Sequence, residues 1–471
     1  MAIGTGNIWR FPRIVSQQGG GAFIIAWIFF LFLWSIPLLI IEISIGKKTR
    51  LGVIGSFSRI MGQKFAWMGT FVTFVTTAIM FYYSVVTGWC LKYLFASVFQ
   101  GLTKKSSTSF WNGFASSWEP VFFHLAAMAI GGFIIYSGVV KGIERANKIL
   151  IPSLFLLLGI ACIRSLTLPG AVHGLNFLFS PNLSRLGDYK MWLNALSQSA
   201  WSTGAGWGLI LTYAVYTNRK ENATITATTL GFGNNLASLL AAMAVIPTVF
   251  SYFASQGFSV ERVLDVMKTD NQGLTFIWIP NLFSNIPGGP VFLALFFLAL
   301  SFAAFSSLIS MIELDTRILM DSGFSRKKAV SIIVICGFIF GLPSALSMGF
   351  FNNQDWVWGL GLMVSGFFYT IAVIKFGPGK FRKEIISSPE NPVKIGRWFD
   401  ILVAVLLPLQ FVAMLGWWLW QSYAGDPGNW LKIFSPFSVG TVLFQWGIAA
   451  ALFIFLNKII TRNILGKNYE T

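Results

Sequence analysis

Charged and reactive side chains are scarce in this sequence. Only 11% of its 471 residues are Asp, Glu, Lys or Arg. Two histidines, His124 and His173, are too few for a metal cluster, and the three cysteines lie in apolar segments where no disulfide framework is expected. No nucleophile–base pair and no phosphate-cradling loop can be recognised. The sequence therefore predicts that the protein is not an enzyme.

Apolar residues dominate instead. The hydrophobic fraction is 55%, aromatic residues make up 16% of the chain, and the mean hydropathy is +0.69. A soluble domain of this length could not bury so much apolar surface. We therefore expect an all-α, polytopic membrane protein.

The apolar residues form runs long enough to cross a bilayer. A spanning helix needs about 20 apolar residues, and about twelve segments qualify, the first of them short. They cover residues 5–17, 21–46, 65–99, 120–139, 146–166, 191–216, 226–252, 290–320, 329–348, 356–376, 399–421 and 437–458.

The net charge of +17 could indicate a nucleic-acid ligand, but its distribution indicates a membrane orientation. Basic residues concentrate in the short connections after the second, fourth, sixth, eighth and tenth segments. These connections share one side of the membrane if every segment crosses once, and Lys and Arg favour the cytoplasmic side. We expect a multi-pass protein of the plasma membrane, such as a bacterial inner membrane, with both termini in the cytoplasm.

Glycines interrupt two corresponding apolar segments. Gly4 and Gly6 open the first segment, and Thr203–Gly208 interrupts the sixth. Glycine tolerates backbone conformations that other residues avoid, and unwound backbone at membrane depth must line a protein or polar cavity. Because five segments precede the second break, the two halves have opposite orientations. Paired breaks of this kind indicate a secondary transporter with inverted repeats.

The chain is therefore predicted to form a single transmembrane transporter domain over 1–471. Residues 1–166 would form the first five-helix repeat and residues 189–376 the second, inverted repeat. The last two helices, within 399–460, would stand outside the repeats.

Several motifs resemble the neurotransmitter:sodium symporter family, including its leucine-transporter-like bacterial amino-acid branch. The run Gly6-Asn7-Ile8-Trp9-Arg10-Phe11-Pro12 with Gly19–Phe23 is similar to the family's first-helix signature. Further matching motifs are Tyr82-Tyr83, Lys141–Arg145, Gly174–Phe177 and Ala303–Ser307. They follow the family's order across essentially the whole chain.

The resemblance implies two sodium sites made of backbone carbonyls and of Asn and Ser side chains. The first would comprise the substrate carboxylate, the Ala2 carbonyl, Asn7, the hydroxyl and carbonyl of Ser202, and Asn234. The second would comprise the carbonyls of Ile3 and Ala303 and the hydroxyls of Ser306 and Ser307. Asn235 follows Asn234, so the register of that ligand stays open by one residue. A lone Asn7 would be read as a helix cap, and a lone Ser306-Ser307 pair as a packing feature.

The resemblance also implies a substrate site beside the unwound backbone. Its predicted residues are Ala2, Gly4, Gly6, Ile79, Tyr83, Trp201, Gly204, Trp207, Ser307 and Met311. Relatives that carry amines have Asp where Gly4 stands, whereas amino-acid transporters have Gly. We therefore expect an amino acid with an apolar side chain. The family usually has Phe where Trp201 and Trp207 occur, and such residues are otherwise ordinary core aromatics.

A chloride site and two gates complete the implied set. The chloride positions would be Trp27, Gln198, Ser202, Asn234 and Ser238. Trp27 stands where relatives have Tyr, and its indole N–H can still donate a hydrogen bond. Arg10 and Asp355 would form the outer gate, and Asp321 the acidic side of the cytoplasmic gate.

Two expectations concern missing or unassigned partners. Residue 1 falls where the first helix of relatives is already unwound, so we expect the preceding half-helix to be missing from this chain. One carbonyl of the second sodium site and the basic partner of Asp321 would lie in that half-helix. Glu42 has no assignable charged partner, and we expect it to bond to unwound backbone.

The combined prediction is a sodium-coupled symporter that imports an amino acid by alternating access, with two sodium ions and possible chloride dependence. A proton-coupled amino-acid symporter would need a titratable group at the second sodium site. A non-transporting amino-acid sensor would keep the pocket without the ion ligands. An ion channel is disfavoured, since the helix breaks form one pair rather than a ring.

Overall fold

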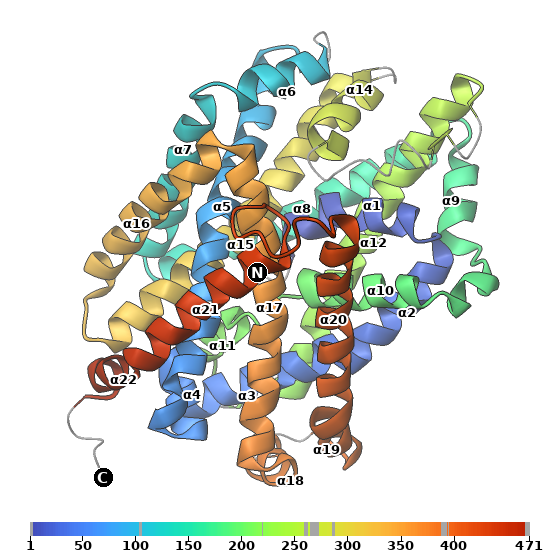
Figure 1. Ribbon diagram of the computed structural model, residues 1–471. Helices are drawn as coiled ribbons and strands as arrows, with labels where there is room; N and C mark the ends of the chain where they lie inside the picture. The colour runs from blue at the N-terminus through green and yellow to red at the C-terminus, as the bar shows by residue number, and fades with distance from the viewer. Residues whose placement is uncertain are drawn as a thin grey trace. The chain divides into compact units, whose positions relative to one another are not determined.

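The computed structural model describes residues 3–102, 106–218, 220–258, 262–263, 273–284, 288–387, 393 and 395–466. Every regular element within these ranges is a helix (Figure 1). The chain divides into two compact units, each assembled from separate stretches of sequence. Unit 1 comprises Met1–Phe30, Ser84–Thr203 and Phe232–Leu308, and unit 2 comprises Leu31–Tyr83, Gly204–Gly231 and Ile309–Thr471.

The helices of unit 1 are η1 (Gly6–Arg10), α1 (Phe11–Gln17), α2 (Gly21–Phe30), α6 (Ser107–Ala115), α7 (Glu119–Tyr136), η5 (Val139–Glu144), α8 (Arg145–Leu166), α9 (Ala171–Phe179), η6 (Leu183–Gly187), α10 (Tyr189–Ser202), η7 (Gly273–Trp278) and α14 (Ile279–Ser284). Three long helices contribute to both units: α5 (Ala66–Phe99), α12 (Ala223–Ser255) and α15 (Gly289–Asp321).

The helices of unit 2 are η2 (Leu31–Ser35), α3 (Ile36–Thr49), α4 (Val53–Met61), η3 (Gln63–Phe65), α11 (Leu209–Ala214), α16 (Arg326–Leu346), α17 (Met348–Phe376), α18 (Pro378–Phe381), η8 (Arg382–Ile386), α19 (Trp398–Ile401), η9 (Leu402–Leu406), α20 (Leu407–Gly425), α21 (Val439–Phe455) and α22 (Asn457–Leu465).

Nine helical stretches in the described part of the chain are long and apolar enough to cross a membrane, and a tenth is the bent pair of α21 and α22. The nine are Gly21–Thr49, Gln63–Phe99, Glu119–Tyr136, Val139–Leu166, Ala223–Phe253, Gly289–Asp321, Arg326–Leu346, Met348–Phe376 and Trp398–Gly425. The other two of the twelve expected segments are those predicted to be broken, so neither forms one long helix.

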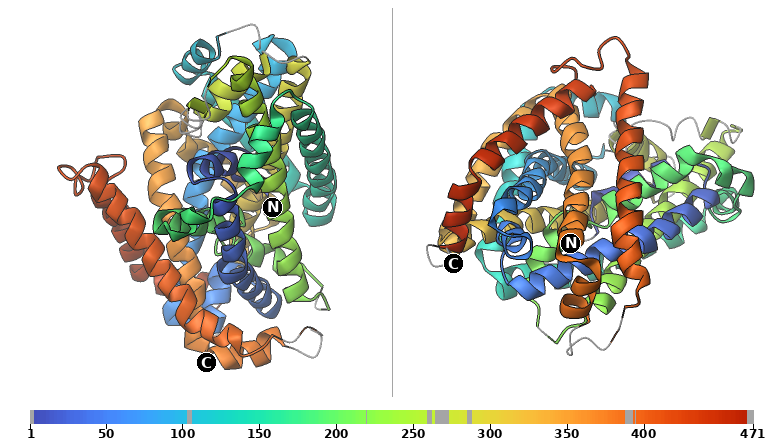
Figure 2. Two further views of the ribbon diagram at one scale, coloured as in Figure 1. Left: turned by 90° about the vertical axis from the view of Figure 1, so that its right-hand side faces the viewer. Right: turned by 60° about the horizontal axis from the view of Figure 1, so that its bottom comes forward.

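The twelfth predicted segment is bent by 59° between α21 and α22, which Figure 2 shows as a turn in the red end of the chain. Asn457 explains the bend. Its side-chain nitrogen donates to the Gln63 carbonyl at 3.0 Å, and its oxygen accepts from the Trp67 N–H at 2.7 Å. Ile464 then packs on Ile54 and Ala66.

In unit 1, α2 packs along α10. Phe29 and Phe30 of α2 meet the Trp192 ring edge-on, with centroid distances of 5.5 and 5.9 Å. Edge-on contact between these large rings, of which Phe30 is buried, holds the two helices against each other. This contact supports the segment of α10 that leads to the second break.

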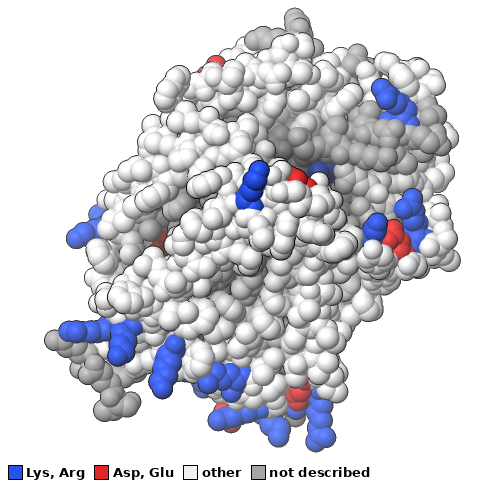
Figure 3. Space-filling model, in the orientation of Figure 1, with Lys and Arg blue, Asp and Glu red and all other residues white. Residues whose placement is uncertain are grey.

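In unit 2, α3 packs against α11, where glycine permits a close approach. A Cβ atom at Gly46 would lie 2.5 Å from the Leu211 carbonyl oxygen. Helices α17 and α20 lie side by side (Figure 1), and Phe367 stacks on Phe411 with centroids 4.2 Å apart. Lys and Arg side chains gather at the end of this unit where α18, α19 and α22 lie (Figure 3).

Candidate functional site

The second predicted break is present as unwound backbone between α10 and α11. Gly204, Gly206 and Gly208 adopt φ values of +67°, +86° and +82°. These left-handed values cost glycine little and other residues about 1–2 kcal/mol. The sequence Thr203–Gly208 therefore ends one helix and starts the next after a short non-helical stretch.

Glu42 lies beneath this break, as the sequence predicted. Its buried carboxylate accepts hydrogen bonds from the backbone N–H groups of Gly206 and Leu211, the second at 3.2 Å. The Thr76 hydroxyl donates to the Trp207 carbonyl oxygen at 2.7 Å. Side chains of unit 2 thus satisfy backbone groups that the missing helical turn leaves unpaired.

The first predicted break differs in detail from the expectation. Ile3 and Gly4 lie outside regular structure, but Gly6 begins a π-helical turn, η1, rather than continuing the unwound stretch. The Phe11 N–H donates to the Gly6 carbonyl, five residues back. The wider π-helical turn keeps most backbone groups bonded, so fewer unwound residues are needed here. Ala2 lies outside the described residues.

Asn7 connects this break to α12. Its side-chain oxygen accepts from the Gly4 N–H at 2.8 Å. Its side-chain nitrogen donates to Asn234 Oδ1 at 2.7 Å and to Ser238 Oγ at 2.8 Å. Asn234 in turn donates to the Ser202 hydroxyl at 3.2 Å. Asn7, Ser202 and Asn234 of the first predicted sodium site therefore share one buried network in unit 1.

The second predicted sodium site is also partly assembled in unit 1. Ser306 Oγ donates to the Ile3 carbonyl oxygen at 2.6 Å. Ala303 and Ser307 lie within one turn of Ser306 on α15, and all three residues are buried. Two residues separated by 303 positions in sequence are thus joined at the first break.

The predicted chloride residues also lie within unit 1. Trp27 is on α2 and Gln198 is on α10, the two helices that pack together. Trp27 Nε1 and both polar atoms of the Gln198 amide are buried without a hydrogen-bond partner among the described residues. Buried donors of this kind are normally satisfied. The binding of chloride by these residues stays a prediction.

The sequence matches the model of the sodium:neurotransmitter symporter family over residues 1–120 and 116–463. This chain belongs to the sodium:neurotransmitter symporter family. It is therefore a sodium-dependent multi-pass membrane transporter and not an enzyme, as predicted.

Individual relatives agree with the family match. An uncharacterised sodium-dependent transporter of Methanocaldococcus jannaschii is 32% identical over 438 residues, covering 88% of this chain and 86% of its own length. The uncharacterised sodium-dependent transporter YhdH of Bacillus subtilis is 30% identical, with coverages of 88% and 94%. The crystal structure of MhsT in complex with L-phenylalanine has a TM-score of 0.76 and 28% identity, covering 88% of this chain and 95% of MhsT.

The predicted substrate residues of this symporter are distributed over both units. Gly4, Gly6, Trp201 and Ser307 belong to unit 1, and Ile79, Tyr83, Gly204, Trp207 and Met311 to unit 2. Ile79 and Met311 are each 1% exposed, and Trp207 is also buried. Assembly of these residues around one substrate stays a prediction.

The outer-gate residues show a contact that the sequence did not suggest. The Arg10 guanidinium lies over the Trp201 ring, 4.8 Å from its centroid. This cation–π contact places the cation against an aromatic side chain of the second break. Asp355 belongs to unit 2, and its pairing with Arg10 stays a prediction.

Asp321 of the symporter has a basic partner within the described chain. Arg317, one turn earlier on α15, lies 2.8 Å from Asp321. The other carboxylate oxygen accepts from the Gly52 N–H at 2.6 Å. The family resemblance places this partner before residue 1. Arg317 could have been identified from the sequence, because i, i+4 spacing on a helix is a known signal for such pairs.

Two further acidic groups were missed by sequence reasoning. Glu313 pairs with Arg326 and accepts from the Tyr216 hydroxyl at 2.8 Å. Asp315 Oδ1 lies 2.7 Å from the Thr77 hydroxyl oxygen, within hydrogen-bond distance. The signal was available, because charged residues within an apolar span are rare and commonly functional.

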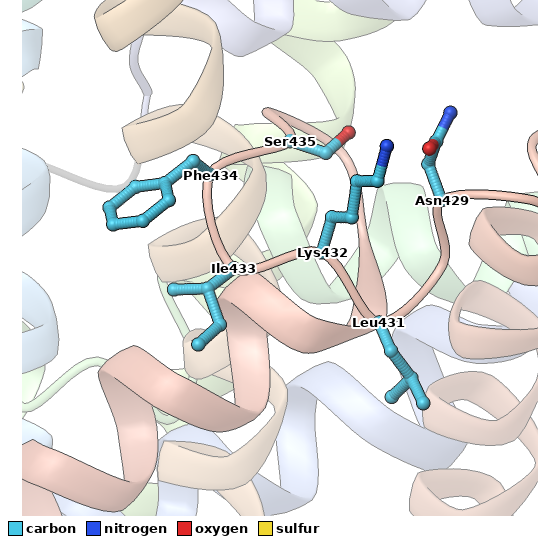
Figure 4. A pocket seen from close by; sticks show the side chains of 6 residues that line it. All are labelled: Asn429, Leu431, Lys432, Ile433, Phe434 and Ser435. Atoms are coloured by element: carbon cyan, nitrogen blue, oxygen red, sulfur yellow. The ribbon is translucent and has the colours of Figure 1, made fainter.

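No group of three or more His, Cys, Asp or Glu side chains suited to a metal ion occurs in the described ranges. A hollow of about 520 Å³ lies in the connection between α20 and α21 (Figure 4). It is lined by Asn429, Leu431, Lys432, Ile433, Phe434 and Ser435. None of the predicted site residues borders it, and we assign it no ligand.

Proposed function

We propose that this symporter couples the entry of sodium to the uptake of an α-amino acid with an apolar side chain, by alternating access. The observation that carries the proposal is the Asn7 network. An amide at the first helix break lies 2.7 Å from the Asn234 side chain, 227 residues away, with the Ser202 hydroxyl adjoining. Such a gathering of neutral oxygen-bearing side chains at a helix break suits a sodium ion.

Two sodium ions would be carried as cargo with the amino acid. The first would use Asn7, Ser202 and Asn234, which the network brings together. The second would use Ser306, Ser307 and the carbonyls of Ile3 and Ala303. The contact between Ser306 and the Ile3 carbonyl supports this second set, because it puts two of the oxygen ligands 2.6 Å apart.

The substrate class follows from what the first break lacks. Gly4 offers no carboxylate to pair with the ammonium of an amine, whereas helix-end carbonyls can accept from an α-amino group. The substrate carboxylate would then complete the first sodium shell. Ile79 and Met311 present no charge, which favours an apolar side chain. The complex of MhsT with L-phenylalanine is consistent with this class.

Sodium and substrate would strengthen each other's binding because they share a ligand. The same factor must apply in both directions, since linkage between two binding events is reciprocal. Movement of sodium down its gradient then drives the uptake of the amino acid. The expected location is the plasma membrane, with both termini in the cytoplasm, in keeping with the basic end of unit 2.

We extend the proposal to chloride. Trp27 and Gln198 offer buried donors that have no partner among the described residues. The other three predicted residues, Ser202, Asn234 and Ser238, are linked to one another through the Asn7 network. An anion there would balance part of the sodium charge. Sodium-driven uptake should therefore fall when chloride is replaced by gluconate.

The decisive experiment is a panel of amino acids tested on the purified protein for thermal stabilisation in sodium and in potassium. A ligand that binds the folded state raises the unfolding temperature. We expect stabilisation by apolar amino acids in sodium only, and loss of both effects in Asn7→Ala. Asn194→Ala is the matched control, because among the described residues the Asn194 amide bonds to the Lys190 carbonyl of its own helix and to no predicted site residue. Equal stabilisation in potassium would refute sodium coupling.

A further inference from the structure

Asp315 is a buried acid that neither proposed sodium site uses. It lies in unit 2 on α15 and is 5% exposed. Four residues before it on the same helix face is Met311, and Thr77 of α5 lies against its carboxyl. The carboxyl therefore sits about one helical turn, ~6 Å, from one predicted substrate residue.

The hydrogen bonds around Asp315 favour a neutral carboxyl. Thr77 Oγ1 lies 2.7 Å from Asp315 Oδ1 and 2.9 Å from the Thr73 carbonyl oxygen. A hydroxyl has one hydrogen, so Thr77 can donate to only one of these oxygens at a time. If Asp315 carries a proton on Oδ1, it donates to Thr77, and Thr77 donates to the Thr73 carbonyl. Both short contacts are then hydrogen bonds.

Beyond the Thr77 hydroxyl, the described residues form no hydrogen bond or ion pair with Asp315. Asp315 Oδ2 is buried and has no partner among the described residues. No Lys, Arg or His nitrogen of the described residues forms an ion pair with Asp315. An unpaired charge at such a site is costly, so the group keeps its proton.

Other titratable groups nearby are already engaged. On α15, Glu313 and Arg317 lie two residues to either side, which turns them to another face of the helix. Glu313 is bonded to Arg326 of α16 and to Tyr216 after α11, and Tyr213 of α11 contacts Ser310. Arg317 is bonded to Asp321. From α5, the contact with Asp315 is made by the hydroxyl of Thr77.

Glu42 of the same unit provides the contrast. It is equally buried, but backbone N–H groups of Gly206 and Leu211 point at its two oxygens. Those donors stabilise a negative charge, one of them at the start of α11. Among the described residues no backbone N–H points at Asp315, whose hydrogen-bonding neighbour is the Thr77 hydroxyl.

We propose that Asp315 is a proton-binding site that exchanges its proton with the cytoplasm during the transport cycle. Six residues, about 9 Å of helix, separate it from the end of α15 that is predicted to be cytoplasmic. Water entering from that end would hydrate the carboxyl, which then ionises at neutral pH and releases the proton to that water. When the site closes again, Asp315 regains a proton from the cytoplasm.

This inference rests on the proposed sodium-driven uptake and gives it a dependence on internal pH. Ionised Asp315 favours the hydrated, cytoplasm-open form, so a higher internal pH should ease substrate release. One titrating group can change the fraction of open protein by at most about tenfold per pH unit. External pH should not act through Asp315.

The test uses the full chain in proteoliposomes with L-phenylalanine as probe and internal pH set to 6, 7 or 8. Wild-type initial uptake should rise several-fold with internal pH, whereas Asp315→Asn, which mimics the protonated acid, should give one rate throughout. Thr77→Val should shift the pH midpoint. Its matched control, Thr70→Val, should not, because within the described part of the chain the Thr70 hydroxyl bonds to the Ala66 carbonyl of its own helix and not to Asp315.

A second measurement does not depend on transport. Infrared spectra of the purified protein should show the C=O stretch of a protonated carboxyl that is lost in Asp315→Asn. Absence of that band, retained internal-pH dependence in Asp315→Asn, or an Asp315-dependent effect of external pH would overturn the proposal. If neither protein showed sodium-driven uptake, the proposed function would fail, and the infrared band would still decide whether Asp315 holds a proton.

Discussion

Ser306 Oγ lies 2.6 Å from the Ile3 carbonyl oxygen and so joins α15 to the break in the first helix. The Ser306 hydroxyl donates the hydrogen bond and the Ile3 carbonyl oxygen accepts it, and neither group is charged. Both oxygens could instead coordinate a cation that lies beside them. A substitution at this contact should therefore test the second proposed sodium site independently of the first.

Ser306→Ala should weaken sodium binding while leaving substrate recognition at the first site in place. Loss of one hydrogen-bonding ligand of a buried group costs about 1–3 kcal/mol, so we expect roughly a 5- to 150-fold higher sodium requirement. Sodium titrations of uptake measure this, and the curve should become less steep because one ion no longer contributes.

Ser301→Ala is the matched control for this change. Ser301 is buried on the same helix, and its hydroxyl donates to the Phe297 carbonyl one turn earlier. Its removal should leave the sodium requirement within about twofold. Equal effects of the two variants would mean that Ser306 is a packing residue and not an ion ligand.

Gly206→Ala should destabilise the protein more than Gly204→Ala. Both positions have positive φ, but a Cβ atom at Gly206 would lie 2.6 Å from the Gly366 Cα atom, whereas nothing lies within 4 Å of one at Gly204. The shared backbone strain costs about 1–2 kcal/mol, and Gly206 adds a steric clash. Thermal unfolding in the absence of ligand measures the difference. Indistinguishable unfolding temperatures would show that the approach to Gly366 is not required.

The helix breaks illustrate what could be predicted from sequence. Glycines within an apolar run mark positions where helical backbone is easily abandoned, and the unwound stretch with Gly204, Gly206 and Gly208 confirms this for the second break. The same reasoning predicted that Glu42 would bond to unwound backbone. At the first break it predicted a longer unwound stretch, since Gly6 gives no sign that a π-helical turn can satisfy its neighbours.

The contacts between distant segments could not be predicted in the same way. Asn7 and Asn234 were paired only through a family resemblance, because neither spacing nor periodicity relates residues so far apart. The pairing of Asp315 with Thr77 depends on how α15 is rotated against α5, and in two mostly apolar helices no apolar stripe defines that rotation. The pairing of Asp321 with Arg317 was accessible, since both lie on one helix.

Ser238→Glu should make uptake independent of chloride. Ser238 Oγ lies 2.8 Å from the Asn7 side-chain nitrogen, so a carboxylate here would place a permanent negative charge beside the first sodium site. We expect at least a fivefold drop in uptake on replacing chloride by gluconate in the unmodified protein, and less than twofold in the variant. Ser238→Gln, of equal size without charge, should not rescue uptake in gluconate. Rescue by both variants would show that bulk rather than charge matters.

Gly4→Asp should abolish the preference for amino acids. The new carboxylate would lie at the first break, where the N–H of residue 4 already bonds to Asn7. Two like charges about 4 Å apart repel by up to about 4 kcal/mol at a partly shielded site, so binding of an α-amino acid should weaken by at least about tenfold. Gly4→Asn has nearly the same size without the charge and should weaken binding far less. Competition binding with L-phenylalanine and with phenethylamine measures both substrate classes. If Gly4→Asp and Gly4→Asn lost L-phenylalanine equally, the loss would come from steric crowding, and the argument that Gly4 selects for a carboxylate-bearing substrate would be wrong.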